Sequence, residues 1–491
     1  MNTGDLHEKP KWTAAFRNWI SLAGLIIILI GVFTFLLLAG LDAVAHFANP
    51  YLGILTYMVT PGVGAGGIFL VLLGAWLERR RKRKTGFDAT VKLDLANPHD
   101  RRILGLFLIG GLIFLLLSAV GSYQTYHFTE SVQFCGETCH TVMQPENVAY
   151  HNGSHARVAC VECHIGEGAT WFVKSKMSGS YQVYAVLANK YSKPIPTPVK
   201  NLRPAQETCE RCHWPSKFVG NLDRTYNYFL TDATNTPYSV RLLLKVGGAD
   251  PTHGPVGGIH WHMSVANKIE YYASDEARQK IPYVRMTDAQ GVVTEFRAGR
   301  FTNTVSDAQL RRMDCMDCHN RPAHIFTTPV DAVNLAMSLG KIDRSLIYIK
   351  TNAVDVLAKH YATQDEALKG IATTLANRYP GDPRISATIN AVQEIYTNNF
   401  FPEMNTDWRS HASNLGHKDW PGCFRCHDGE HKSADGKRII KANDCTTCHI
   451  ILAQGSGAEL LKLSATGQKF NHPGDEIPDG YLCSDCHNGG P

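Results

Sequence analysis

Three long apolar runs dominate the first 123 residues of the chain. They cover 20–41, 51–77 and 103–123, and none of them contains a charged residue. Each run reaches or exceeds the roughly 20 residues that a helix needs to cross a bilayer. Helices buried in a soluble core are the alternative, but they rarely stay uncharged over such lengths. The pattern therefore predicts a membrane domain over 1–123 with three transmembrane helices.

The basic residues around these runs predict their orientation. Lys9, Lys11 and Arg17 precede the first run, 79–84 is entirely basic, and 42–50 has no Lys or Arg. Because basic loops stay in the cytoplasm, the N-terminus and the loop after the second run are expected there. The third helix then carries 124–491 into the periplasm. We predict a multi-pass protein of the cytoplasmic (inner) membrane, in contact with lipid, and no nucleic-acid partner for the basic cluster.

Beyond residue 124 the pattern changes several times. A helical stretch over 166–191 mixes apolar and basic residues, which favours a helix along the membrane interface or one packed against a cofactor. Residues 239–300 alternate in β fashion and predict a small antiparallel insert. Residues 329–399 have helical periodicity with few breakers.

All fourteen cysteines of the 491-residue chain occur in seven pairs, and each pair is followed directly by histidine. The cysteines are Cys135, Cys139, Cys160, Cys163, Cys209, Cys212, Cys315, Cys318, Cys423, Cys426, Cys445, Cys448, Cys483 and Cys486. The histidines are His140, His164, His213, His319, His427, His449 and His487. We number these sites 1 to 7 in chain order.

The spacing C-x-x-C-H is the attachment sequence of a c-type haem. Two thiols bond the macrocycle and the adjacent imidazole reaches the iron. Zinc ribbons also use C-x-x-C pairs, but they do not need His after the second Cys. Histidine is only 22 of 491 residues, so its presence in all seven slots favours haem. The sequence predicts seven covalently attached c-type haems.

Site 1 departs from this spacing, because three residues separate Cys135 from Cys139. Either the loop bulges by one residue and both thioether bonds form, or only one bond forms. We expect a fully attached haem.

A low-spin haem needs a second axial ligand, most often His and sometimes Met. Twelve histidines beyond residue 124 lie outside the motifs. We expect six of them to be distal ligands, with His262 favoured over His260 and His417 over His411. The six are His155, His262, His324, His417, His431 and His472. Met143 is the candidate ligand at site 1.

These observations predict a mainly α membrane protein with a haem-packed, loop-rich multihaem c domain and a small antiparallel β insert. The expected divisions are 1–123 (membrane domain), 124–218 (sites 1 to 3), 219–310 (β-rich insert) and 311–491 (sites 4 to 7, with a helical insert at 329–399).

The segments FCGETCH, SHARVACVECH and TCERCHW, which follow an apolar helix, resemble the NapC/NirT (NrfH-like) family of membrane-anchored cytochromes. The whole arrangement is similar to the ImcH-type seven-haem inner-membrane cytochromes. The resemblance implies that menaquinol is oxidised at the outer membrane face and that periplasmic c-type cytochromes receive the electrons. It also implies Met ligation at the haem nearest the membrane, here Met143, and a Lys near the quinol, matched by Lys174 and Lys176. Gln182 stands where relatives have an acidic residue.

A quinol dehydrogenase needs an electron acceptor and a proton acceptor at the membrane edge. Lys174, Lys176, Glu137 and His127 are the catalytic candidates, and Glu130 and Glu146 could also accept protons. Two other functions use the same motifs. One is an electron conduit without a quinone site, and the other is a terminal oxyanion reductase, which would need an open iron position.

Overall fold

The computed structural model describes residues 18–45, 56, 59–85, 95–138, 140–166, 169–199, 202–247, 257–264, 267–441, 445–474, 476–478 and 480–490. It divides the chain into two compact units. The first unit is Met1–Phe134 with Ile165–Tyr181, and the second is Cys135–His164 with Gln182–Pro491. Most regular structure is helical, as predicted, and the sheets are small and antiparallel.

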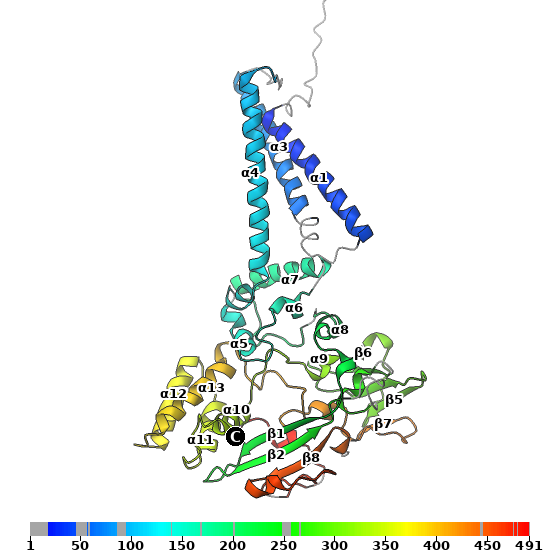
Figure 1. Cartoon of the computed structure of the whole chain (residues 1–491), viewed down its shortest axis with the longest axis vertical. Coiled ribbons are helices and arrows are strands. Elements are labelled where there is room, and N and C mark those ends of the chain that lie inside the picture. The colour runs from blue at the N-terminus through cyan, green and yellow to red at the C-terminus, as the bar shows by residue number, and fades with distance from the viewer. Residues whose placement is uncertain are drawn as a thin grey trace, which may run out of the picture. The chain divides into compact units, whose positions relative to one another are not determined.

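The first unit contains α1 (Trp19–Ala45), α3 (Thr60–Thr85), α4 (Pro98–Thr129) and most of α7 (Ala169–Leu187) (Figure 1). Among the described residues, Trp19–Gly40 and Thr60–Lys84 are helices long and apolar enough to cross a membrane. The 32-residue α4 contains the third predicted run. Asn97 caps it by accepting a hydrogen bond from the His99 backbone N–H at 2.9 Å, and Pro98 suits the first turn.

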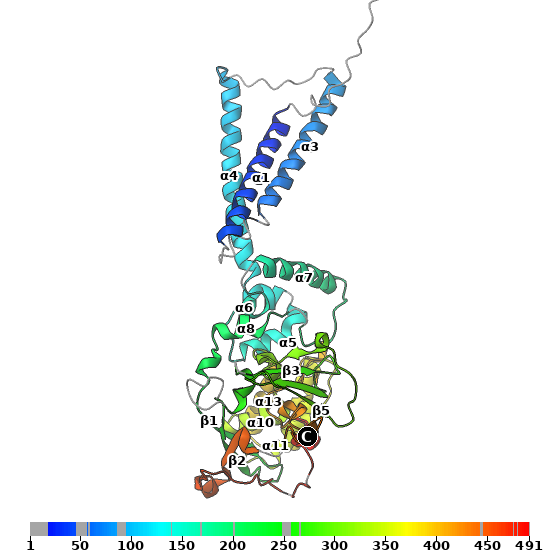
Figure 2. The same cartoon turned by 90° about the vertical axis from the view of Figure 1, so that its right-hand side faces the viewer.

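Small residues let α1 and α3 pack closely side by side (Figures 1 and 2). A Cβ added to Gly24 would lie 2.6 Å from the Gly67 carbonyl oxygen, and one added to Gly67 would lie 2.8 Å from that of Gly24. Ser21 Oγ donates across the same interface to the Val71 carbonyl at 3.1 Å. Close backbone approach through glycine is typical of helix pairs in membranes, where lipid offers no hydrophobic gain.

The second unit contains two antiparallel sheets. One has the order β1-β2-β8, and the other has the order β6-β3-β4-β5-β7. Their strands are β1 (Leu222–Phe229), β2 (Pro237–Leu244), β3 (Lys268–Tyr272), β4 (Tyr283–Thr287), β5 (Val293–Ala298), β6 (Arg311–Arg312), β7 (His431–Ser433) and β8 (His449–Gly455).

The sequence prediction missed that each sheet takes a strand from the C-terminal region. β8 pairs with β2, with Leu244 opposite His449, and β7 pairs with β5, with Ala298 opposite His431. β8 begins at His449, the motif histidine of site 6. The predicted β segment is therefore paired directly with the haem motif of site 6.

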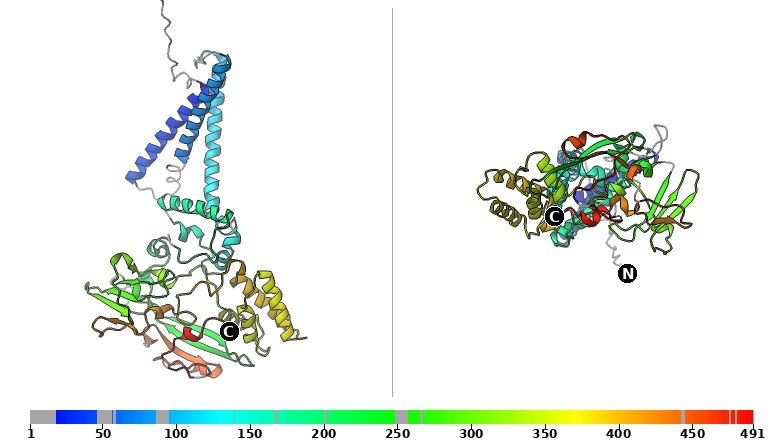
Figure 3. Two further views of the ribbon diagram at one scale, coloured as in Figure 1. Left: turned by 180° about the vertical axis from the view of Figure 1, so that it is seen from behind. Right: turned by 90° about the horizontal axis from the view of Figure 1, so that it is seen from below.

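Four helices occupy the segment predicted to be helical, namely α10 (Pro329–Ser338), α11 (Ile349–Ala358), α12 (Gln364–Arg378) and α13 (Ile385–Asn399). They build the largest apolar core of the unit, in which Ile349, Leu357, Ile371 and Leu375 are fully buried. Figures 1 and 3 show these helices at the opposite side of the unit from the β3-β4-β5 sheet. The remaining helices are α5 (His140–His151), α6 (Cys160–His164), α8 (Ala205–Thr208), α9 (Cys315–Cys318) and α14 (Cys483–Cys486).

Leu375→Ala is expected to destabilise this helical core by about 2–5 kcal/mol, because it removes a fully buried side chain and leaves a cavity. The measurement is the urea midpoint of the helical circular-dichroism signal. Leu335→Ala in α10 is the matched control, since Leu335 is 59% exposed. Equal shifts for the two variants would contradict this description of the core.

Candidate functional site

In most motifs a short helical turn connects the histidine to the first cysteine of its pair, four residues earlier. The His213, His319 and His487 backbone N–H groups each donate to the carbonyl of Cys209, Cys315 and Cys483 at 2.8 Å, and His427 donates to Cys423 at 3.1 Å. Residues four apart lie on one face of a helical turn. Each turn therefore presents its first thiol and its imidazole to the same side, as covalent haem attachment requires.

The wider motif of site 1 forms a π-helical turn over Phe134–Thr138. A π turn accommodates one residue more than an α turn, which is the length that this motif adds. Gly136 faces Asn147 of α5 so closely that a Cβ there would overlap the Asn147 amide. Cys139 and the His140 side chain lie outside the described residues. Met143 lies half-buried on α5.

At the six other sites, a second imidazole faces the motif histidine. The ring centres are 6.3 Å apart for His164 and His324, 6.1 Å for His213 and His155, 6.3 Å for His319 and His260, 5.9 Å for His427 and His262, 6.2 Å for His449 and His417, and 6.0 Å for His487 and His472.

This spacing suits two imidazoles on opposite sides of one metal ion. Two metal–nitrogen bonds of about 2 Å, plus about 1.2 Å from each nitrogen to its ring centre, place the rings about 6 Å apart. Direct stacking would bring the rings closer, as for His417 and Phe424 at 4.4 Å. The six pairs therefore fit the haem group that the cysteines imply.

Four of the second imidazoles are oriented through Nδ1. The contacts are His155 to the Pro322 carbonyl at 3.0 Å, His260 to Val246 at 2.6 Å, His262 to Ile259 at 2.9 Å and His324 to Glu146 at 3.0 Å. Only a protonated Nδ1 can donate to a carbonyl, so Nε2 carries the lone pair that binds metal. Burial lowers the pKa of His324 to about 4 and also lowers the pKa of His260, which favours the neutral ligating form.

His431 lies in a different environment from these rings. Its Nδ1 is 2.8 Å from Asp428 Oδ1, and its Nε2 is 2.7 Å from the Ile281 carbonyl. Both ring nitrogens therefore have hydrogen-bond partners in a nearly fully buried side chain, and no lone pair faces a motif histidine. His260, which the sequence ranked below His262, faces His319 instead. The signal was present in GGIHWHM, where both histidines stand together.

Residues of successive motifs also touch. The Cys160 and Cys135 sulfurs lie within hydrogen-bond reach of each other. Cys209 and Cys315 are in the same relation. Glu162 of site 2 pairs with Arg211 of site 3 at 3.0 Å. Sites 1 and 2, 2 and 3, and 3 and 4 are thus neighbours in the fold.

The predicted quinol-site residues separate into different environments. In the first unit, Lys176 Nζ is 3.2 Å from Glu130 Oε1 and donates to Thr129 Oγ1 at 3.2 Å and to the Thr129 carbonyl at 3.3 Å. This contact joins α7 to the end of α4, and Figures 1 and 2 show the lower end of α4 beside α7. The side chains of Lys176 and Glu130 are 29% and 16% exposed, so the pair is partly shielded from water.

The other catalytic candidates lie elsewhere. Lys174 Nζ sits 4.8 Å from the centre of the Trp171 ring, a cation–π contact. His127 is exposed and packs edge-on against Tyr123 at 4.4 Å. Glu137 is exposed in the π turn of site 1. The structure thus brings Lys176 together with Glu130, which the sequence offered only as a secondary candidate.

The cysteine–histidine sites and their facing imidazoles define a multihaem c-type cytochrome, a protein of electron transfer. Residues 97–196 match the NapC/NirT cytochrome c family, N-terminal region. The chain is 40% identical over 489 residues to the cytochrome c-type protein ImcH of Geobacter sulfurreducens, covering 96% of this chain and 95% of ImcH. It therefore belongs to this family of NapC/NirT-type multihaem cytochromes. No solved structure matches the chain significantly.

Proposed function

We propose that this protein oxidises menaquinol at the periplasmic face of the cytoplasmic membrane and passes the electrons to periplasmic c-type cytochromes. The observation that carries the proposal is the Lys176–Glu130 ion pair between α7 and the end of α4. Family membership supports it, because NapC/NirT cytochromes transfer electrons from quinol to cytochromes. When bound, the haems supply the one-electron chemistry of this transfer.

The membrane topology follows from the helices and their flanking charges. The basic residues Lys82, Arg83 and Lys84 end α3, which favours a cytoplasmic end for that helix. Helix α4 begins 13 residues after α3 ends, so its first turn belongs on the same side. The far end of α4, with Thr129 and Glu130, then reaches the periplasmic interface. Exposed apolar side chains on α7, namely Met177, Tyr181, Val183, Tyr184 and Leu187, suit a helix at that interface.

The ion pair has the chemistry that quinol oxidation requires. A quinol must lose two protons along with two electrons, and a carboxylate at the membrane edge can accept a proton from a quinol hydroxyl. The Lys176 ammonium can donate a hydrogen bond to the quinol oxygen and favour its anionic form. Thr129 holds Lys176 in place from two oxygens. Glu130 thereby supplies the acidic group that Gln182 lacks.

Axial ligands for sites 2, 3, 6 and 7 are proposed from the facing rings. They are His164 with His324, His213 with His155, His449 with His417, and His487 with His472. Met143 stays the proposed ligand at site 1. With two ligands from the chain at each of these sites, a bound haem would have no iron position open to an oxyanion, which favours electron transfer over terminal reduction.

Lys176→Met is expected to slow haem reduction by a menaquinol analogue about tenfold or more, because it removes a charged hydrogen-bond donor from the quinol site. The measurement is anaerobic stopped-flow of the detergent-solubilised oxidised protein, followed at the haem Soret band. Dithionite reduction should be unchanged. Lys190→Met is the matched control, since Lys190 follows α7 and donates to Tyr184 Oη at 2.9 Å.

Two results of this experiment would contradict the proposal. Equal rates for Lys176→Met and the unsubstituted protein would remove the ion pair from quinol chemistry. A protein that dithionite reduces but no quinol reduces would instead be a conduit that receives electrons from another membrane complex.

Seven haems per chain are expected, because each of the seven motifs supplies two thiols and a histidine. The intact mass should exceed that of the polypeptide by seven haems, and pyridine haemochrome absorbance should give the same ratio. Double substitution of Cys483 and Cys486 by Ala calibrates the count by removing one covalent haem. A count of six in the unsubstituted protein would contradict this expectation.

A further inference from the structure

A five-residue 3₁₀ turn, Ile259–Met263, contains two histidines that face two different haem motifs. His260 lies parallel to His319 of site 4, with an interplanar angle of 4°. His262 lies edge-on to His427 of site 5, with an angle of 81°. In a 3₁₀ helix, residues two apart point about 120° away from each other, so the two imidazoles diverge. On a strand they would have shared one face.

The turn is anchored firmly to the end of β2. Gly258 has φ of +81°, and a Cβ there would overlap the Lys245 carbonyl oxygen, so only glycine fits without strain. The Ile259 N–H donates to that carbonyl at 2.8 Å. His260 Nδ1 is 2.6 Å from the Val246 carbonyl. These contacts fix the positions from which both imidazoles extend.

A second set of contacts joins sites 4 and 5 on the motif side. Arg425, inside the site 5 motif, donates from Nη2 to the backbone carbonyl of Asp317, inside the site 4 motif, at 2.6 Å. Asn414 Nδ2 donates to the same carbonyl at 3.0 Å. Arg425 and Asp317 are 9% and 2% exposed, so this contact is well shielded from water. The two motifs are therefore held together in the interior.

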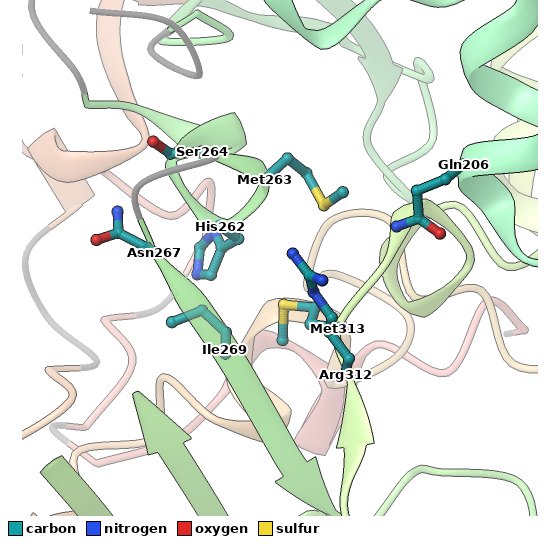
Figure 4. Close-up of a pocket in the computed structure, with 8 residues that line it drawn as sticks. All are labelled: Gln206, His262, Met263, Ser264, Asn267, Ile269, Arg312 and Met313. Atoms are coloured by element: carbon teal, nitrogen blue, oxygen red, sulfur yellow. The ribbon is translucent and has the colours of Figure 1, made fainter. Parts of the chain in front are cut away.

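A small pocket lies beside His262. Figure 4 shows His262 there with Met313, Ile269 and the guanidinium of Arg312. An arginine at this position would pair with a carboxylate such as a haem propionate. Trp261 and Cys426, a haem-attachment cysteine of site 5, both pack on the apolar cluster that includes Ile269.

We propose that His260 and His262 are the distal ligands of two different haems, at sites 4 and 5 respectively, and that the Ile259–Met263 turn joins these haems into one rigid pair. His260 takes this role in place of His431, whose two ring nitrogens both have other partners. Because one turn and the Arg425–Asp317 contact hold both sites, haems bound there would be held in a fixed relation to each other, and the charge on one would affect the potential of the other. This rests on the haem ligation proposed above and not on quinol oxidation.

The test uses the full-length protein, reduced with dithionite and then reoxidised. The spin state of its oxidised haems is measured by electron paramagnetic resonance with spin quantification. His260→Gln and His262→Gln should each convert one low-spin haem to high-spin, and the double variant should convert two. Each vacated iron should also bind one carbon monoxide in the reduced protein. His431→Gln is the control and should produce no high-spin haem.

A second variant keeps the test decisive if a glutamine variant fails to mature. His260→Met retains a sixth ligand and should leave all haems low-spin while raising the midpoint potential of one haem in a spectroelectrochemical titration. One high-spin haem in the double variant, or none in either single variant, would overturn the proposal. A high-spin haem in His431→Gln would restore His431 as a ligand. None of these outcomes depends on quinol reactivity.

Discussion

An imidazole binds iron only through a neutral nitrogen that no hydrogen bond occupies, and two such nitrogens must face each other across a gap of about 4 Å. The second unit is arranged around this requirement. Short turns fix motif histidines beside their own thiols, but the facing ring at each of sites 2 to 7 lies outside the motif. His155 precedes the site 2 motif yet faces His213 of site 3, and His324 follows the site 4 motif yet faces His164 of site 2. Correct spacing at one site therefore depends on the folding of its neighbours.

Backbone carbonyls make these distant rings rigid. Pro322, Glu146 and Val246 each accept a hydrogen bond from the Nδ1 of a facing histidine, so tautomer and ring direction are set by elements remote in sequence. The sheets contribute in the same way, because Lys245 and Val246, just after β2, hold the Ile259–Met263 turn, and β2 pairs with β8, which begins at His449. The proposed haem pair at sites 4 and 5 continues the direct contacts that join sites 1 to 4. Such a series of neighbouring motifs would suit stepwise electron transfer between the haems they hold.

The first unit is subject to a different constraint. Helices α1 and α3 pack closely through Gly24 and Gly67. Between helices in lipid the hydrophobic effect gives no driving force, so close backbone contact takes its place. At the end of α4, the apolar part of the helix is followed by Glu130, which pairs with Lys176 of α7. A lysine and a carboxylate that are partly shielded from water are costly to keep apart, so Lys176 and Glu130 stabilise each other while remaining near the surface. The proposed quinol chemistry uses this pair.

The sequence by itself determined the chemistry and the broad organisation of this protein. Cysteine and histidine spacing predicted the haem motifs, long uncharged runs predicted the apolar helices, and the site 1 to 3 motifs led to the family, because these features depend only on local spacing and composition. Tertiary structure decided which histidine faces which motif, and it favoured His260 over His431. It also decided that Glu130 meets Lys176, and that β7 and β8 complete the two sheets. Those outcomes depend on contacts between residues far apart in the chain, which neither periodicity nor motif spacing records.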